Sequence, residues 1–155
     1  MPKRQVFYSF HYGKDCRRVQ QIRNMGVFEG NEPVSASAWE DVQREGNVAV
    51  ERWIDDNMKY RSCVVVLIGE DTANRPWVKY EIKKAYELGK KIIGIYIRNL
   101  KDPIFGKCSK GKNPFDQFKV SDGSLLSKHI KCYDPNSRDA YNDIKQNMNR
   151  WIEQA

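Results

Sequence analysis

The sequence predicts a doubly wound α/β fold, in which a mostly parallel sheet is flanked by helices. Two apolar, β-branched runs at 63–68 and 91–97 have the composition of strands buried on both faces, as the strands of parallel sheets are. The segment between them is long enough for the crossover helix of a βαβ unit. Pro76 suits the first turn of that helix and Gly89 its end, so we expect a helix from about 76 to 89.

The other segments alternate between strand-like and helix-like patterns, which is typical of an α/β domain. We expect further strands at 5–10, at 34–39 as a weak edge strand, and at 129–133 as a short last strand. We expect further helices at 16–26, at 47–59 with Asn47 as its cap, and at 137–153.

Polar and turn-forming residues predict the connections. Loops are expected at 11–15 and 40–46, and a turn at 29–33. The segment 99–127 contains prolines, glycines and interspersed phenylalanines. We expect it to be a long ordered loop or insertion with one helical turn, because loops of that length in compact domains are usually functional.

Composition limits the class of protein. At 155 residues, the chain is expected to form a single domain, 1–155, with a proper core. No apolar run approaches the length of a membrane span, and the first residues lead into a strand rather than a signal peptide. The four cysteines lack metal-ligand spacing and there are only two histidines, so we expect reduced thiols in a cytoplasmic protein and no metal site.

The formal net charge of +7 is compatible with nucleic acid or with a small anionic ligand. The basic residues are scattered along the chain, and no recognition helix, zinc finger or basic-aromatic motif accompanies them. The charge alone therefore does not favour nucleic acid.

Glu81 is the one charged residue within the apolar arc of the expected helix 76–89. At 100° per residue, Val78, Ile82, Ala85 and Leu88 share that arc with it. A carboxylate that faces a sheet is costly unless it is paired or reaches a cleft. Two interpretations remain open, a first-turn carboxylate that favours the helix dipole and reaches solvent, and a functional carboxylate at the rim of the sheet.

Topology places Glu81 near the end of the first strand. In a flavodoxin-like strand order, 2-1-3-4-5, ligands bind at the carboxyl ends of the strands, between the first and third strands. The loop after the first strand begins at Ser9, and the segment after the third strand runs from Gly69 into the helix that carries Glu81. We therefore expect Glu81 to lie beside Ser9–His11 at this crevice.

Two boxes in the sequence resemble those of TIR domains. Phe7–Phe10, which ends the first strand and precedes Asp15, is similar to the opening TIR box, and Trp77–Ile82 is similar to the TIR helix motif Trp-Val-x-x-Glu-Ile/Phe. The match is closer to the TIR-like signalling proteins of the bacterial Thoeris antiphage-defence system, and it covers about residues 5–100. The residues that carry this closer match are Phe7–Tyr12, Arg23–Asn24, Trp39–Asp41, Ile68–Gly69 and Asn74–Trp77.

The resemblance implies an enzyme that cleaves the nicotinamide–ribose bond of NAD, with Glu81 as the catalytic residue and NAD as substrate rather than cofactor. Thoeris members make a signal nucleotide from the ADP-ribose portion, a cyclic ADP-ribose isomer or a related adduct, which activates a partner effector. One carboxylate suffices for this reaction, because nicotinamide leaves as a neutral base and an anion stabilises the oxocarbenium-like ribose.

Neighbouring residues supply the other groups that a dinucleotide requires. Ser9 and His11 could bond to ribose or phosphate, although Ser9 could also cap the strand end. Arg75, at a helix start, could bind the pyrophosphate or remain solvated. The remaining candidates each have a structural alternative, core packing for the aromatic residues and turn capping for the acidic residues: Phe10, Trp39 and Trp77, and Asp15 and Asp41.

Two other functions compete with this one. A non-catalytic TIR module would act by assembly, and the change Glu81→Gln would then leave its function intact. The polar stretch after Trp39 departs from the usual TIR assembly loop, so a homo-oligomer is possible but its mode is not implied. A flavodoxin-like receiver is disfavoured, because the first strand lacks an acidic cluster and no glycine-rich phosphate motif is present.

Overall fold

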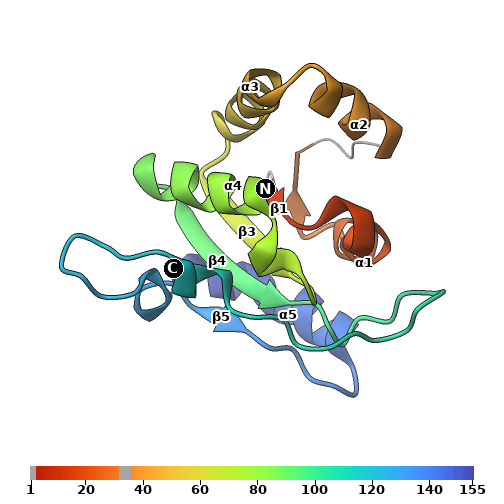
Figure 1. Ribbon diagram of the computed structural model, residues 1–155. Helices are drawn as coiled ribbons and strands as arrows, with labels where there is room; N and C mark the ends of the chain where they lie inside the picture. The colour runs from red at the N-terminus through yellow and green to blue at the C-terminus, as the bar shows by residue number, and fades with distance from the viewer. Residues whose placement is uncertain (1–2, 32–35) are drawn as a thin grey trace.

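The computed structural model describes residues 3–31 and 36–155, with side chains described from Trp39 onward in the second helix. A five-stranded parallel sheet forms its centre, with helices on both faces (Figure 1). The strand order β2-β1-β3-β4-β5 confirms the predicted fold class and order. The strands are β1 (Arg4–Ser9), β2 (Phe28–Glu29), β3 (Cys63–Ile68), β4 (Lys91–Tyr96) and β5 (Cys132–Tyr133). The helices are α1 (Tyr12–Asn24), α2 (Ala36–Arg44), α3 (Asn47–Met58), α4 (Pro76–Glu87) and α5 (Ala140–Glu153).

The sheet separates two apolar layers. Every residue of β3 is buried, and successive side chains point to opposite faces. Val65 packs in the layer that α1 and α5 cover, and Val64 packs in the layer that α3 and α4 cover. Burial on both faces explains why the strand has no polar alternation in its sequence.

The predicted edge strand at 34–39 and the loop at 40–46 are wrong. Helix α2 begins at Ala36 and continues to Arg44, while residues 34 and 35 lie outside the described part of the chain. Trp39 and Val42, three residues apart, both pack against the core, which is the spacing of a helix face. The second strand is instead the two-residue β2, which begins just before the predicted turn.

Capping residues account for the errors at helix ends. The expected loop at 11–15 is the first turn of α1, because His11 is the N-cap and its Nδ1 accepts a hydrogen bond from the Gly13 N–H at 3.1 Å. Helix α5 begins at Ala140 rather than 137, and Asp139 caps it. Helix α3 extends over the predicted range, but Gly46 rather than Asn47 is its N-cap.

The segment 99–127 crosses the carboxyl edge of the sheet and is fastened to α1. Arg18 donates hydrogen bonds to the carbonyl oxygens of Leu100 and Gly106, at 2.9 Å and 2.7 Å, and Arg17 pairs with Asp102 at 3.0 Å. Phe115, fully buried, anchors a 3₁₀ turn at Pro114–Gln117. A further turn at Leu126–Lys128 was not predicted. Near residues 100–110 the segment extends away from the sheet (Figure 1).

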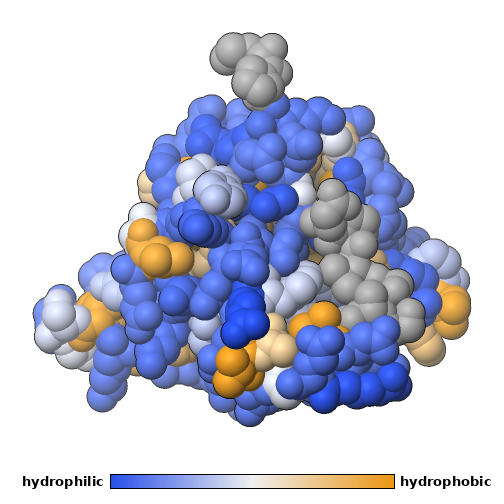
Figure 2. All heavy atoms as spheres, turned by 90° about the horizontal axis from the view of Figure 1, so that it is seen from above, coloured by the Kyte–Doolittle hydropathy of each residue, from blue (hydrophilic) through white to orange (hydrophobic). Residues whose placement is uncertain are grey.

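The surface is mainly polar. On the face seen in Figure 2, hydrophobic residues form small separate groups among hydrophilic ones. Ile104 and Phe105 are adjacent exposed hydrophobic residues in the extending loop, and Leu88, which periodicity assigns to the apolar arc, is half exposed because α4 ends at Glu87. No helix in the described ranges is both long and apolar enough to cross a membrane.

Gly111 allows the long segment to contact the end of β3. A Cβ at this position would lie 2.0 Å from the carbonyl oxygen of Gly69, a backbone atom that no side-chain rotation can move away. We expect Gly111→Ala to destabilise the protein by about 1–3 kcal/mol, because the segment must shift. Urea unfolding would measure this cost, with Lys112→Ala, an exposed neighbour, as control. Equal stability of the two variants would contradict the close approach of Gly111 to the Gly69 carbonyl oxygen.

Candidate active site

Glu81 and Ser9 form a buried pair at the carboxyl end of β1. The Ser9 hydroxyl donates a hydrogen bond to Glu81 Oε1 at 2.8 Å. Ser9 is fully buried and Glu81 is 6% exposed. Because α4 begins at Pro76, Glu81 lies in its second turn and faces the sheet, rather than in a solvated first turn. The structure therefore brings Glu81 beside Ser9, as the strand order predicts.

Burial changes the protonation of Glu81. Removal from solvent raises the pKa of Glu81 to about 8, and the hydrogen bond from Ser9 lowers it only in part. Burial, and then the nearby Glu81 carboxyl, raise the pKa of the Tyr12 hydroxyl. Glu81 is therefore mainly protonated at pH 7 in the free protein, and only about a tenth of the molecules carry the carboxylate.

A row of aromatic rings lies at the same edge. Phe10 stacks on Tyr12 with ring centroids 4.5 Å apart, and Tyr12 stacks on Trp39 at 4.8 Å. Trp39 in turn contacts Trp53 of α3 edge-on at 5.3 Å. The row thus connects the end of β1 with α1, α2 and α3. Tyr12 and Trp53 were not among the predicted site residues. Tyr12 ends the box Phe7–Tyr12, and Trp53 lies at an apolar position of the expected helix 47–59.

Most of the predicted substrate-binding residues line one small hollow. Its volume is about 80 Å³. A drug-sized ligand usually occupies a pocket of about 300–1,000 Å³, so the hollow is too small for a dinucleotide as it stands. Five of its lining residues were predicted from the sequence: Phe10, His11, Trp39, Arg75 and Trp77.

Ser9 and Glu81 are not among the residues that line this hollow, and neither are the two acidic candidates. Asp41 lies on the exposed side of α2, where Arg44 pairs with it at 3.1 Å. Asp15 is buried on α1 and pairs with Arg18 at 3.1 Å. Within residues 3–31 and 36–155, no group of three or more acidic, histidine or cysteine side chains is arranged to hold a metal ion.

The small hollow carries positive charge on the side formed by Arg75. Arg75 is the N-cap of α4, so its charge adds to the partial positive charge of the helix N-terminus. Burial, followed by the charges of Arg75 and Lys14, lowers the pKa of His11. His11 is therefore neutral at pH 7 and can form a hydrogen bond with a ligand. Arg75 supplies the positive charge that would attract an anionic group of the ligand.

The buried Glu81 carboxyl should reduce stability at alkaline pH. The unfolded chain releases the Glu81 proton at about pH 4.5 and the folded protein only at about pH 8, so stability falls as pH rises between these values. We expect Glu81→Gln to be more stable than the native chain by about 1–3 kcal/mol at pH 8.5 and similar to it near pH 4.5. Urea unfolding at both pH values would measure the difference.

Glu87→Gln provides a matched control, because Glu87 is exposed on the same helix. If Glu81→Gln and Glu87→Gln had the same stability difference from the native chain at both pH values, Glu81 would not be held in its neutral form.

Comparison with known proteins places the chain in a family. The family described as Thoeris protein ThsB, TIR-like domain, matches residues 7–102, a range that contains both Ser9 and Glu81. The chain is also 40% identical over 152 residues to the Bacillus cereus (strain MSX-D12) protein named "Putative cyclic ADP-D-ribose synthase ThsB1". That alignment covers 93% of this chain and 78% of the relative. The chain therefore belongs to the family of Thoeris ThsB proteins with a TIR-like domain.

Proposed function

We propose that the protein is a NAD-consuming TIR enzyme of antiphage defence. It cleaves the nicotinamide–ribose bond and makes an ADP-ribose-derived signal, a cyclic ADP-ribose isomer, that activates a partner effector. The observation that carries this proposal is the buried Glu81 carboxyl, held by Ser9 at the ligand-binding edge of the sheet. The name of the Bacillus cereus relative supports the cyclic product.

The reaction needs a negative charge close to the ribose. When the bond from the ribose C1′ to the nicotinamide nitrogen breaks, both electrons remain on nitrogen, and nicotinamide leaves as a neutral base. The positive charge that develops on the ribose is stabilised by the Glu81 carboxylate. The nicotinamide ring of NAD is itself cationic, so bound substrate favours the ionised form of Glu81 and lowers its pKa.

A nucleophile then captures C1′ and determines the product. A group from the adenosine half of the same molecule closes the ring and gives a cyclic product, whereas water gives linear ADP-ribose. Where the nucleophile is a hydroxyl or water, it loses a proton, and the Glu81 carboxylate can accept that proton.

NAD must enlarge the small hollow in order to bind. The stacked rings of Tyr12 and Trp39 belong to different helices, so separating α1 from α2 would open a path toward Glu81. Trp39 and Trp77 could then stack on the rings of the dinucleotide, and Arg75 with the N-terminus of α4 could bind its pyrophosphate.

The decisive test compares phage-infected cells that express the native chain or Glu81→Gln. We expect the native chain to deplete NAD and accumulate an ADP-ribose-derived product, and Glu81→Gln to lower product formation at least about 100-fold, because the carboxylate acts on the transition state. Mass spectrometry of extracted nucleotides would measure both, with Glu87→Gln as control. Identical profiles in an infection that the native chain blocks would instead support a non-catalytic assembly module.

Ser9 should act by positioning Glu81 and tuning its charge. The hydrogen bond from Ser9 lowers the pKa of Glu81, so Ser9→Ala should raise that pKa further. We expect kcat/KM for NAD to fall about tenfold at pH 7, and the rising limb of its pH profile to move to higher pH. The measurement is a pH profile of NAD turnover by the purified chain, with infected-cell lysate as trigger. If the rising limb of the pH profile were the same in Ser9→Ala as in the native chain, Ser9 would not tune the charge of Glu81, however much the rate of NAD turnover fell.

A further inference from the structure

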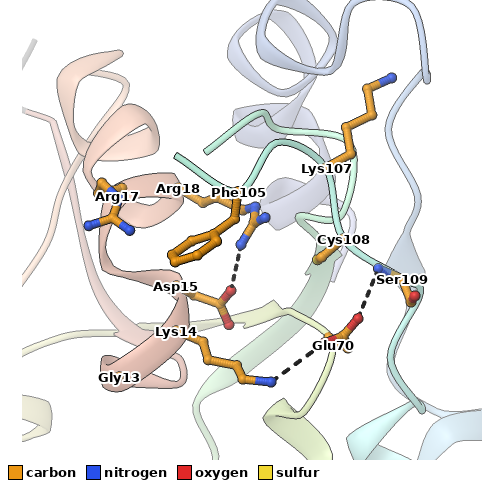
Figure 3. Close-up of a pocket in the computed structure, with 10 residues that line it drawn as sticks. All are labelled: Gly13, Lys14, Asp15, Arg17, Arg18, Glu70, Phe105, Lys107, Cys108 and Ser109. Atoms are coloured by element: carbon orange, nitrogen blue, oxygen red, sulfur yellow. Dashed lines mark hydrogen bonds and ion pairs between the residues drawn. The ribbon is translucent and has the colours of Figure 1, made fainter. Parts of the chain in front are cut away.

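A second and larger hollow lies on the α1 side of the carboxyl edge. Its volume is about 610 Å³, within the range of small-molecule sites. Its walls are formed by the start of α1, by Glu70, which lies two residues after β3, and by the loop 105–109 (Figure 3). It shares no lining residue with the small hollow that Trp39 and Trp77 line.

Positive charge predominates in its lining. Lys14, Arg17, Arg18 and Lys107 face two acidic residues, Asp15 and Glu70, so the formal charge is +4 − 2 = +2. Arg18 is buried, and each of its three guanidinium nitrogens already donates a hydrogen bond, to Asp15 or to a backbone carbonyl. The charges available to a ligand are therefore those of the three exposed cations.

Each of these three cations already has a partner, and the partners differ in how readily they can be replaced. Lys14 pairs with Glu70 at 3.5 Å and also with Asp71, and the Lys14 side chain is half exposed. Arg17, also about half exposed, pairs with Asp102. Lys107 donates to the carbonyl of Ser137. The Lys14 pairs are solvent-exposed and contribute little free energy, so an incoming phosphate could replace them. Arg17 keeps its pair with Asp102, whose side chain is buried, and Figure 3 shows Lys107 directed away from the other lining residues.

Phe105 gives the hollow an aromatic wall. The side chain is 72% exposed although it is large and apolar. The Arg17 guanidinium lies 5.6 Å from its ring centroid, and Figure 3 shows the ring directed into the hollow toward Asp15. A ring that is exposed in this way and next to a cation can stack on a nucleobase.

Asp15 offers an unused acceptor. Its Oδ1 accepts from Arg18, but within the described part of the chain its Oδ2 is buried and has no hydrogen-bond partner. Buried polar atoms are usually paired, so an unpaired oxygen in the wall of a hollow calls for a donor from elsewhere. The absence of a side chain at Gly69 permits this arrangement, because a Cβ there would lie 2.2 Å from Oδ2. A ribose hydroxyl is a donor of suitable size.

From these groups, we propose that the hollow binds a nucleoside diphosphate. Its phosphates lie near Lys14 and Arg17, its base stacks on Phe105, and a ribose hydroxyl donates to Asp15 once that carboxyl turns toward the hollow. The site is separate from Glu81 and does not depend on the proposed reaction. A phosphate that draws Lys14 away from Asp71 would also alter the charge near His11 and Arg75, since the Asp71 carboxylate interacts with both.

Titration calorimetry of the full chain with ADP at low salt tests the site. We expect Phe105→Ala and Lys14→Ala each to weaken ADP binding about tenfold, and adenosine, which lacks phosphates, to bind at least tenfold more weakly than ADP. Ile104→Ala and Lys101→Ala are matched controls, because both residues are exposed in the same loop and neither lines the hollow. We expect these controls to bind ADP within about twofold of the native chain. No binding of millimolar ADP, or equal binding by all four variants, would overturn the proposal.

The same chemistry could come from a free nucleotide or from the ADP portion of NAD. A competition experiment with Glu81→Gln, a variant that should not consume NAD, distinguishes these two sources. If the ADP portion of NAD occupies the hollow, saturating NAD will abolish ADP binding in Glu81→Gln, and Phe105→Ala will weaken NAD binding. If a free nucleotide occupies it, ADP binding will persist in saturating NAD. Both results support the site, and the ADP titration of the native chain remains valid if NAD is not a substrate.

Discussion

Burial of the Glu81 carboxyl against the Ser9 hydroxyl is the interaction on which the ligand-binding edge depends. A single hydrogen bond compensates only part of the lost hydration of a carboxylate, so the group stays neutral in the free protein. The parallel pairing of β1 with β3 and the start of α4 at Pro76 place both residues on the same side of the sheet. The fold thus maintains an unfavourable environment for the Glu81 carboxylate, which the cationic nicotinamide ring of NAD would relieve in the proposed reaction.

The edge carries two hollows with different properties. One is small, and its aromatic lining consists of Phe10 after β1, Tyr12 of α1, Trp39 of α2 and Trp77 of α4. The other is larger, basic and open, and the long segment after β4 forms one of its walls. Lys14 and Asp71 form an ion pair between the two regions, so a charge that binds on one side can influence the other. This arrangement gives the net positive charge a role in binding small anionic ligands, without requiring nucleic acid.

Sequence patterns were sufficient to predict features that follow from local rules. The apolar runs of β3 and β4 and the helix between them predict a parallel βαβ unit, and the flavodoxin-like strand order expected for such a sheet places Glu81 near Ser9. Hydrophobic periodicity did not predict the two-residue strand β2, helix α2, or the start of α1 at its N-cap His11. The stacking of Tyr12 on Trp39 joins two helices, and the basic hollow requires the 99–127 segment to be held by Arg18. Such tertiary contacts leave no periodic signal in the sequence.

The protonation of Glu81 is the property that most directly tests this account. An NMR titration of the protein labelled with ¹³C at the glutamate side-chain carboxyls would resolve it, with the Glu81→Gln spectrum providing the assignment. We predict one glutamate carboxyl that titrates near pH 8 and is absent from the variant. If the resonance lost in the variant instead titrates below about pH 5.5, the carboxyl is solvated and ionised in the free protein, and the account is wrong.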